Sequence, residues 1–224
     1  MDYRFQYQQI ASDVPYILAG AWPTLWITFF TFSVATVLGL FLALGKIRGG
    51  PVTKPLASIW ITLTVNSPLF VVIFFLFNGL PEWGILLSPV QAVLIGFIAI
   101  SSGYLAEIQR GGIQSVRQAE LDAAETLGMT GFQTVRHVIA PHVVKTVYPA
   151  MSNFFIFLML GTSMASLVGV NELTGRAIEI ASRSFRSIEV FTVVALAYVA
   201  LSLLASIALS LVGRSIFRVK MGLI

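Results

Sequence analysis

The chain has 224 residues, of which 57% are hydrophobic and 11% are charged, and its mean hydropathy is +0.87. A soluble domain carries roughly 25% charged residues, so this composition excludes an ordinary water-soluble domain and indicates an integral membrane protein. The absence of cysteine excludes disulfides and thiolate metal sites. The net charge of +4 is explained by Lys and Arg in cytoplasmic loops, so nucleic-acid binding is not expected.

Five apolar segments are long enough to cross a hydrocarbon core of about 30 Å as helices. They cover approximately residues 15–44, 56–80, 90–108, 146–169 and 190–213. Such long apolar runs favour helices over the alternating pattern of a barrel. We therefore expect an all-α polytopic membrane protein with a single transmembrane domain over residues 1–224. No cleavable signal peptide is recognisable before the first span.

The basic residues predict the orientation of these spans. With the N-terminus outside, the outer segments hold Arg4, Arg176, Arg183 and Arg186. The inner segments then hold the other ten basic residues, which are Lys46, Arg48, Lys54, Arg110, Arg117, Arg136, Lys145, Arg214, Arg218 and Lys220. Because cytoplasmic loops collect Lys and Arg, we expect an outside N-terminus and a cytoplasmic C-terminus.

A polar loop at about 107–145 is expected on the inner side, between the third and fourth spans. In its first helix, the acids Glu120 and Asp122 suit the dipole of the N-terminal turn, and Gly128 suits a left-handed cap. One stripe at helical spacing contains Leu121, Ala124 and Leu127 or Gly128, with Ala123 beside it. Small residues on a helix allow close approach by another backbone. The pattern leaves two possibilities open, a contact with a cytosolic partner or packing of the loop against its own spans.

A second loop helix is expected immediately after the break. Thr130 followed by Gln133 is typical of a capping box that starts a helix. Phe132, Val135 and Ile139 share one face of that helix. We expect Pro141 to mark the place where this helix gives way to the fourth span.

These residues carry a resemblance. The segment DAAETLGMTGFQTVRHVIAP, residues 122–141, resembles the EAA loop of ABC importer permeases, with Asp122-Ala123-Ala124, Gly128 and Pro141 at the family's spacing. Three further segments resemble the polar-amino-acid (histidine, glutamine and glutamate type) branch of that family. They are NSPLFVVIFFLFNGLP at 66–81, GYLAEIQRGGIQSV at 103–116 and GVNELTGRAIEIASRSF at 169–185.

The resemblance implies a function and a set of partners. The chain would be the permease subunit of an ATP-driven importer in the bacterial inner membrane, working by alternating access on polar amino acids or close analogues. The EAA helix would be a coupling helix that fits a cleft on a cytosolic ABC ATPase dimer, through Glu120, Leu121, Asp122, Ala123, Ala124, Leu127 and Gly128. A solute-binding protein would deliver the substrate outside, next to a gate formed by residues 171–185; an interfacial helix lying on the membrane is the alternative for that segment.

The chain departs from the family pattern at several positions. Asp122 replaces the usual Glu, and Ala140 replaces the common Leu before the proline. Many relatives carry charged or amide side chains where this chain has Thr62, Val65, Val72 and Leu160-Gly161. Intramembrane charges are costly and normally kept for a purpose. We therefore expect a second, different permease subunit to supply the charged half of the pathway.

An energy source is expected outside this chain. The nearest candidate for a phosphate loop, Gly39 to Ile47, has one residue too many between its glycines and lacks the Ser or Thr that coordinates Mg²⁺. ATP and Mg²⁺ would therefore be bound by the partner ATPase, and the chain is expected to have no catalytic residues. His137 and His142 point to different sides of a helix and are not expected to share a metal. No cofactor is expected.

The spans contain almost no ionisable side chains, so a translocation pathway must use neutral groups, kinked backbone or a partner's charges. Asn66 and Ser67 precede a kink expected at Pro68. Together with Thr162 and Ser163 in the fourth span, they are our candidates for lining the pathway. Hydrogen bonds between or within helices are the alternative role for each of them.

Two other classes of function compete with the importer. A membrane-embedded enzyme predicts clustered acids, histidines or metal ligands near a membrane face, and this sequence lacks such a cluster. A secondary transporter or channel for small polar solutes predicts its own coupling-ion site and usually internal repeats, and neither is recognisable here.

Overall fold

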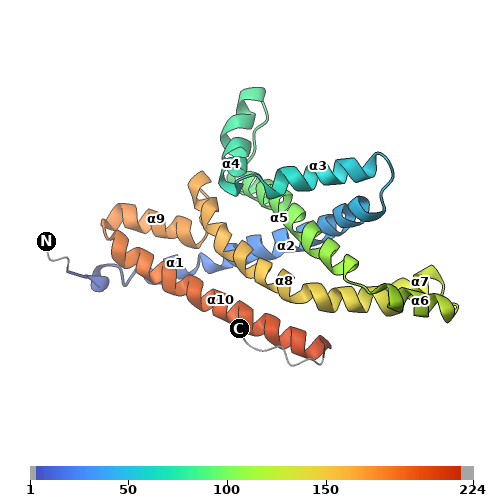
Figure 1. The fold of residues 1–224 in the computed structure, drawn as a ribbon. Helices are drawn as coiled ribbons and strands as arrows, with labels where there is room; N and C mark the ends of the chain where they lie inside the picture. The colour runs from blue at the N-terminus through green and yellow to red at the C-terminus, as the bar shows by residue number, and fades with distance from the viewer. Residues whose placement is uncertain (1–3, 218–224) are drawn as a thin grey trace. The chain divides into compact units, whose positions relative to one another are not determined.

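The computed structural model describes residues 4–217. Every regular element in that range is helical, which confirms the all-α expectation (Figure 1). The long helices are α2 (Ala21–Arg48), α5 (Pro89–Gln114), α8 (Ala140–Gly161) and α10 (Ser187–Phe217). The shorter ones are α1 (Val14–Leu18), α3 (Thr53–Val65), α4 (Leu69–Phe74), α6 (Gln118–Thr126), α7 (Gly131–Thr134) and α9 (Leu173–Ser184). Short segments of 3-10 or π type form η1 (Tyr7–Gln9), η2 (Phe75–Gly79), η3 (Leu80–Trp83), η4 (Val135–Ile139) and η5 (Thr162–Val168).

Within the described range, four helical runs are long and apolar enough to cross a membrane. They are Val14–Arg48, Pro89–Gln114, Gly131–Val168 and Ser187–Ile216. A fifth span exists only if Thr53–Val65 and Leu69–Trp83 are counted together as one broken crossing. The chain thus has four or five candidate spans. Arg218 and Lys220, two of the residues used to predict the orientation, lie outside the described residues.

The run expected as one kinked span at 56–80 is divided by a short non-helical segment. Helix α3 ends at Val65, and Pro68 has extended backbone (φ −65°, ψ 124°) before α4 begins. The break is stabilised locally because Asn66 Nδ2 donates to the Thr62 carbonyl at 2.8 Å and Ser67 Oγ donates to the Leu63 carbonyl at 2.7 Å. The Asn66 N–H also donates to the Thr62 carbonyl at 3.3 Å, so side chains and backbone together satisfy the carbonyls at the end of α3.

Two π-helical turns each end two residues before a proline. The Leu80 N–H reaches the Phe75 carbonyl ahead of Pro81, and the Ala140 N–H reaches the Val135 carbonyl ahead of Pro141. A proline ring clashes with the carbonyl four residues earlier, and a widened turn relieves this crowding. Pro141 therefore does not end the loop helix as expected, because η4 joins α7 directly to α8.

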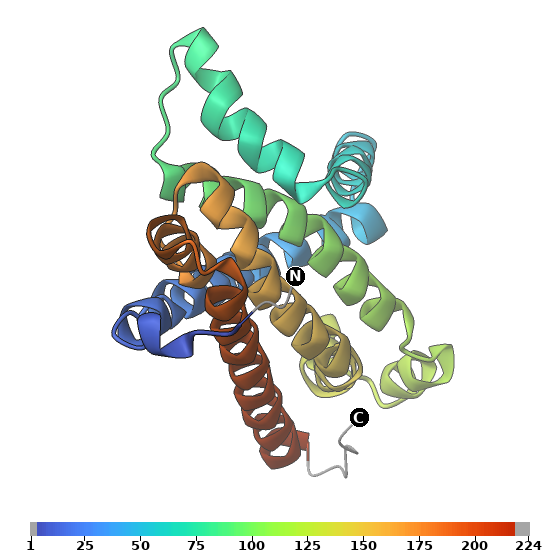
Figure 2. The same cartoon turned by 90° about the vertical axis from the view of Figure 1, so that its left-hand side faces the viewer.

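The described chain forms two compact units. The first contains residues up to 32, 68–97 and 155–209, and the second contains 33–67, 98–154 and the residues from 210 onward. In the first unit, α9 packs beside α1 and the start of α10 (Figures 1 and 2). Its buried face consists of Leu173, Ala177, Ile180 and Ala181, the apolar stripe of the segment 171–185. A second cluster joins Ile27 of α2 and Ile73 of α4 to α5, α8 and η5 through Val93, Phe97, Leu158 and Ala165.

In the second unit, α5 contacts three other helices. Gly39 brings α2 against α5, since a Cβ at Gly39 would lie 2.9 Å from the Ala106 nitrogen. Trp60 of α3 donates from Nε1 to Ser102 Oγ at 3.0 Å. Antiparallel packing of α5 and α8 follows from contacts in reversed order along them. The Tyr104 and Phe154 rings stack at 5.7 Å, and Gly112 lies against Val147.

Candidate functional site

The first loop helix, α6, ends in a glycine cap. Gly128 has a positive φ of 69°. Its N–H donates to the Glu125 carbonyl at 2.8 Å, and the Met129 N–H donates to the Ala124 carbonyl at 3.0 Å. This pair of bonds is a Schellman motif, which satisfies the last carbonyls of the helix and reverses the chain. The cap predicted at Gly128 is confirmed.

The expected stripe of α6 is divided between two environments. Ala124 is 2% exposed, and α6 contacts η4 within the loop. Leu121 is partly buried, whereas Ala123 and Gly128 are exposed and Leu127 is 78% exposed. Glu120 is partly buried and Asp122 is exposed. The loop thus packs on its own chain through Ala124 and presents Leu127 outward.

The second loop helix begins as the sequence predicts. Thr130 Oγ1 accepts from the Gln133 N–H at 3.3 Å, and Gln133 Oε1 accepts from the Thr130 N–H at 2.8 Å, which completes the capping box. The face shared by Phe132 and Val135 is not buried against the chain, since Phe132 is 73% exposed and Val135 is 42% exposed. Sequence reasoning did not select Phe132 as a site residue, because an apolar helical stripe normally marks a buried face.

A polar cluster ties the start of α6 to α5 and α8. His142 Nε2 lies 3.2 Å from Ser115 Oγ, and His142 Nδ1 lies 3.7 Å from Glu120 Oε2. Arg117 donates to Glu120 Oε1 from Nη2 at 2.8 Å. His137 takes no part in this cluster, because its Nδ1 lies 3.0 Å from the Gln133 carbonyl on its own helix.

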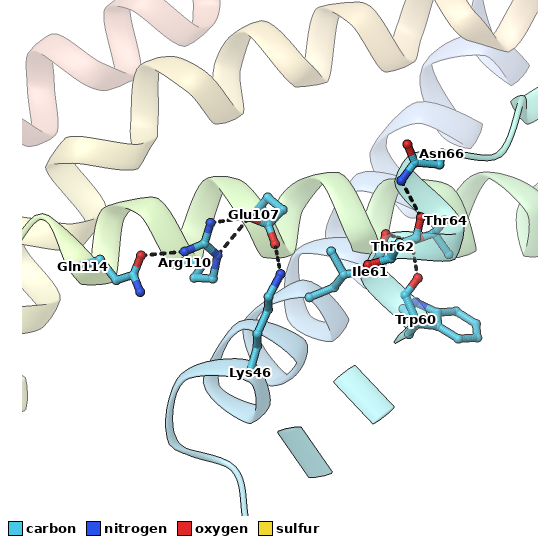
Figure 3. A network of polar contacts seen from close by, with 9 residues as sticks. All are labelled: Lys46, Trp60, Ile61, Thr62, Thr64, Asn66, Glu107, Arg110 and Gln114. Carbon is cyan, nitrogen blue, oxygen red and sulfur yellow. Dashed lines mark hydrogen bonds and ion pairs between the residues drawn. The ribbon is translucent and has the colours of Figure 1, made fainter. Parts of the chain in front are cut away.

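A second polar network lies where α2 meets α5 (Figure 3). Lys46 Nζ donates to Glu107 Oε1 at 2.7 Å, and Arg110 Nη2 donates to Glu107 Oε2 at 2.6 Å. Gln109 Nε2 also donates to the Thr36 carbonyl of α2 at 3.0 Å. These bonds and the close approach at Gly39 hold α2 and α5 together in the second unit.

The four pathway candidates fall in different units and environments. Asn66 is exposed and Ser67 is partly buried, both in the second unit. In the first unit, Ser163 is partly buried and donates to the Leu160 carbonyl at 3.0 Å. Thr162 is fully buried and donates to the Met159 carbonyl at 2.7 Å.

Glu172 is a polar residue whose environment sequence reasoning missed. It caps α9 by accepting from the Gly175 N–H at 2.8 Å, and its other oxygen accepts from Tyr198 at 2.8 Å and Thr24 at 3.3 Å. The side chain is fully buried, and this burial raises the pKa of the Glu172 carboxyl although its hydrogen bonds oppose the shift. In the sequence, Glu172 is one acid of a predicted outer segment, and no local pattern marks it as buried.

Comparison with known proteins identifies the family. The model of the binding-protein-dependent transport system inner membrane component matches residues 35–218. The chain belongs to this family. It is therefore a multi-pass membrane component, and its permease relatives span nearly its full length.

Two curated permeases illustrate this similarity. The probable amino-acid ABC transporter permease protein YckA of Bacillus subtilis is 32% identical over 206 residues, covering 92% of this chain and 91% of YckA. The glutamine transport system permease protein GlnP of Escherichia coli K12 is 29% identical over 208 residues, covering 92% and 95% of the two chains.

Solved structures show the same permease fold. A crystal structure of an amino-acid ABC transporter with histidines matches with a TM-score of 0.89 and 32% identity, covering 96% of this chain and all of that chain. The inward-facing MetNI methionine ABC transporter matches with a TM-score of 0.72, covering 89% and 95% of the two chains. At 20% identity, MetNI shows a shared fold alone.

Proposed function

We propose that this chain is the permease subunit of an ATP-driven importer of polar amino acids or close analogues. The family match and the amino-acid permeases among its relatives support this function. A solute-binding protein delivers the substrate from outside, and a cytosolic ABC ATPase dimer binds ATP and Mg²⁺ and hydrolyses the nucleotide. The spans then alternate between outward and inward access.

The observation that carries the coupling role is the exposed apolar surface of the loop. Leu127, which caps the end of α6, and Phe132 of α7 are 78% and 73% exposed. Large apolar side chains on a polar, water-facing loop are typical of residues that anchor a protein interface. We propose that α6 is the coupling helix, with Glu120, Leu121, Asp122, Ala123, Leu127 and Gly128 at or near the ATPase and Ala124 supporting them from within.

Reconstitution tests the transport function directly. The chain is purified with the ATPase and permease encoded beside it, incorporated into proteoliposomes, and supplied with the binding protein and a panel of radiolabelled amino acids. We expect uptake that requires ATP inside and the binding protein outside. Uptake without nucleotide or ATPase would instead support a secondary transporter or channel, and chemical conversion of a lipid or solute would support a membrane enzyme.

Substitution of the exposed apolar residues tests the interface. Leu127→Ala and Phe132→Ala should each weaken association with the ATPase by about 1–3 kcal/mol, the range of an anchoring interface residue. Leu196→Ala is a matched control, because Leu196 is 65% exposed but lies within a candidate span. Equal retention of the ATPase by all three variants during purification would remove the loop from the interface.

We also propose a heterodimeric permease pair, in which the partner supplies charges that this chain lacks along its spans. Asn66, Ser67 and Ser163 would contribute neutral polar groups to the pathway, with Thr162 supporting Ser163 from within its unit. Native mass spectrometry of the purified complex should find one copy of this chain and one of a different permease. Two copies of this chain in an active complex would contradict the heterodimer.

A further inference from the structure

We infer that His142 is a positioning residue that sets the direction of the coupling helix relative to α5 and α8. The inference rests on the proposed coupling role of α6. It concerns a side chain outside the exposed surface offered to the ATPase. The observation behind it is that one imidazole ring, at the start of α8, lies against both the end of α5 and the first turns of α6.

The hydrogen bonds around Ser115 determine how the ring binds. The Ser115 hydroxyl donates its single proton to the Gly112 carbonyl at 2.7 Å. It can therefore only accept from His142 Nε2, which must carry a proton. His142 Nδ1 faces the Glu120 carboxylate, with 3.7 Å between Nδ1 and Oε2. Arg117 shares this carboxylate, but its side chain is 79% exposed, and exposed ion pairs contribute little.

Two contacts at different points along α6 define the orientation of its axis, whereas a single contact would allow the helix to rotate about that point. The first is the packing of α6 on η4 within the loop, with Ala124 buried in the middle of α6. The second is Glu120, one turn earlier, which faces His142. Between α5 and α6 the residues from Ser115 to Arg117 are not helical, so this short connection does not itself transmit direction. Without the His142 contact, α6 is free to swing about Ala124.

The base of this contact is firmly packed. Gly112 lies against Val147, so that α5 and α8 approach closely one turn before Ser115 and about one turn after His142. The Tyr104 and Phe154 rings stack farther along the same helix pair. His142 therefore joins α6 to two helices that are already held together, and a displacement of α6 is passed to both.

Transport stoichiometry in the reconstituted full complex tests the inference. His142→Ala should lower the amount of substrate imported per ATP hydrolysed by about three- to tenfold, which corresponds to the loss of about one hydrogen bond. His142→Gln keeps a donor group and should recover most of this ratio. His137→Ala is the matched control, because His137 contacts only a carbonyl of its own helix among the contacts described above. It should keep the wild-type ratio.

A double-mutant cycle separates this contact from general loss of structure. Glu120→Gln should lower the ratio as His142→Ala does, and the double variant should be no worse than either single one, because both changes break the same contact. Additive losses would overturn the inference. So would a wild-type ratio in His142→Ala, or an equal loss in His137→Ala. Absence of ATP-dependent uptake in the wild-type complex would instead contradict the proposed function itself.

Crosslinking decides the case if His142→Ala does not assemble. The chain has no cysteine, so thiols placed by Glu120→Cys and His142→Cys are the only ones in this subunit. A short bifunctional thiol reagent that bridges them replaces the lost contact with a covalent one. We expect the bridge to restore assembly and the import ratio relative to the unbridged pair. A bridged complex that stays disassembled or uncoupled would overturn the positioning role.

Discussion

Gly39 allows α2 and α5 to approach so closely that an added methyl group would meet backbone atoms. A Cβ there would lie 2.9 Å from the Ala106 nitrogen, whereas a Cβ at Gly111 meets nothing within 4 Å. Backbone atoms cannot rotate aside as a side chain can. Close helix packing therefore requires a glycine at position 39 but not at position 111, although both residues lie in helices.

Gly39→Ala should lower stability by about 1–3 kcal/mol through overpacking. Gly111→Ala should leave it unchanged or raise it by about 0.5–1 kcal/mol, because alanine costs less entropy in a helix. Thermal unfolding of the two variants in the same detergent measures the difference. Equal melting temperatures would show that α2 can shift without cost.

The buried Glu172 predicts a pH dependence of stability. Its pKa is raised in the folded protein, so the folded state holds the proton more tightly than the unfolded chain does. Stability should therefore fall as the pH rises from the ordinary carboxyl pKa to the raised value. Glu172→Gln cannot ionise and should lose this decline. Melting temperatures of both proteins across that range provide the measurement, and parallel pH curves would contradict the assignment.

At the scale of the element, the glycine cap of α6 predicts the effect of a single substitution. Gly128 has a φ of 69°, and a Cβ there meets nothing within 4 Å. Gly128→Val should thus act through backbone strain alone, at a cost of about 1–2 kcal/mol. We expect Gly128→Val to reduce both ATPase retention and import per ATP.

Two further variants separate strain from side-chain bulk. Gly128→Asn should keep much of the coupling, because asparagine tolerates the left-handed conformation. Gly131→Ala should be neutral, since Gly131 is equally open in space but has no positive φ. Normal transport by Gly128→Val would leave this segment an ordinary loop.

The loop also shows which features local sequence can predict. The cap at Gly128 and the capping box at Thr130 and Gln133 depend on bonds within a few residues, so the sequence predicted both. The orientation of Ala124 and Phe132 depends on packing between helices, and the apolar pattern alone could not assign it. Glu172 is the extreme case, because its partner Thr24 lies 148 residues away in the chain.

The sequence predicted where prolines disturb the helices, but not whether a proline ends a helix or widens one of its turns. A kink was expected at Pro68, yet α3 ends there because Asn66 and Ser67 bond back to the last helical carbonyls. At Pro141 the opposite happened, since a π turn kept the helix continuous. The carbonyl four residues before Pro68, of Thr64, accepts from the Ser67 N–H at 3.4 Å, whereas ahead of Pro141 the helix widens into a π turn.

At the scale of the whole molecule, the predicted orientation can be tested with single cysteines in a chain that has none of its own. Thr53 and Ser182 are both exposed, in segments predicted to lie inside and outside. A membrane-impermeant maleimide should label Ser182→Cys in intact spheroplasts. It should label Thr53→Cys only after permeabilisation. The reverse pattern would contradict the positive-inside assignment.

The π turn at Val135–Ile139 has a consequence for how this permease tolerates changes in length. One extra residue in a turn rotates everything that follows by about 100° around the helix axis. The angle around the helix axis between Phe132, before the turn, and His142, after it, therefore depends on that single residue. Loops commonly accept insertions and deletions, but a one-residue deletion here would rotate the outward apolar face away from the anchored one. The number of residues from Thr130 to His142 thus matters because it sets the rotation of one face relative to the other, not because it sets the distance between them.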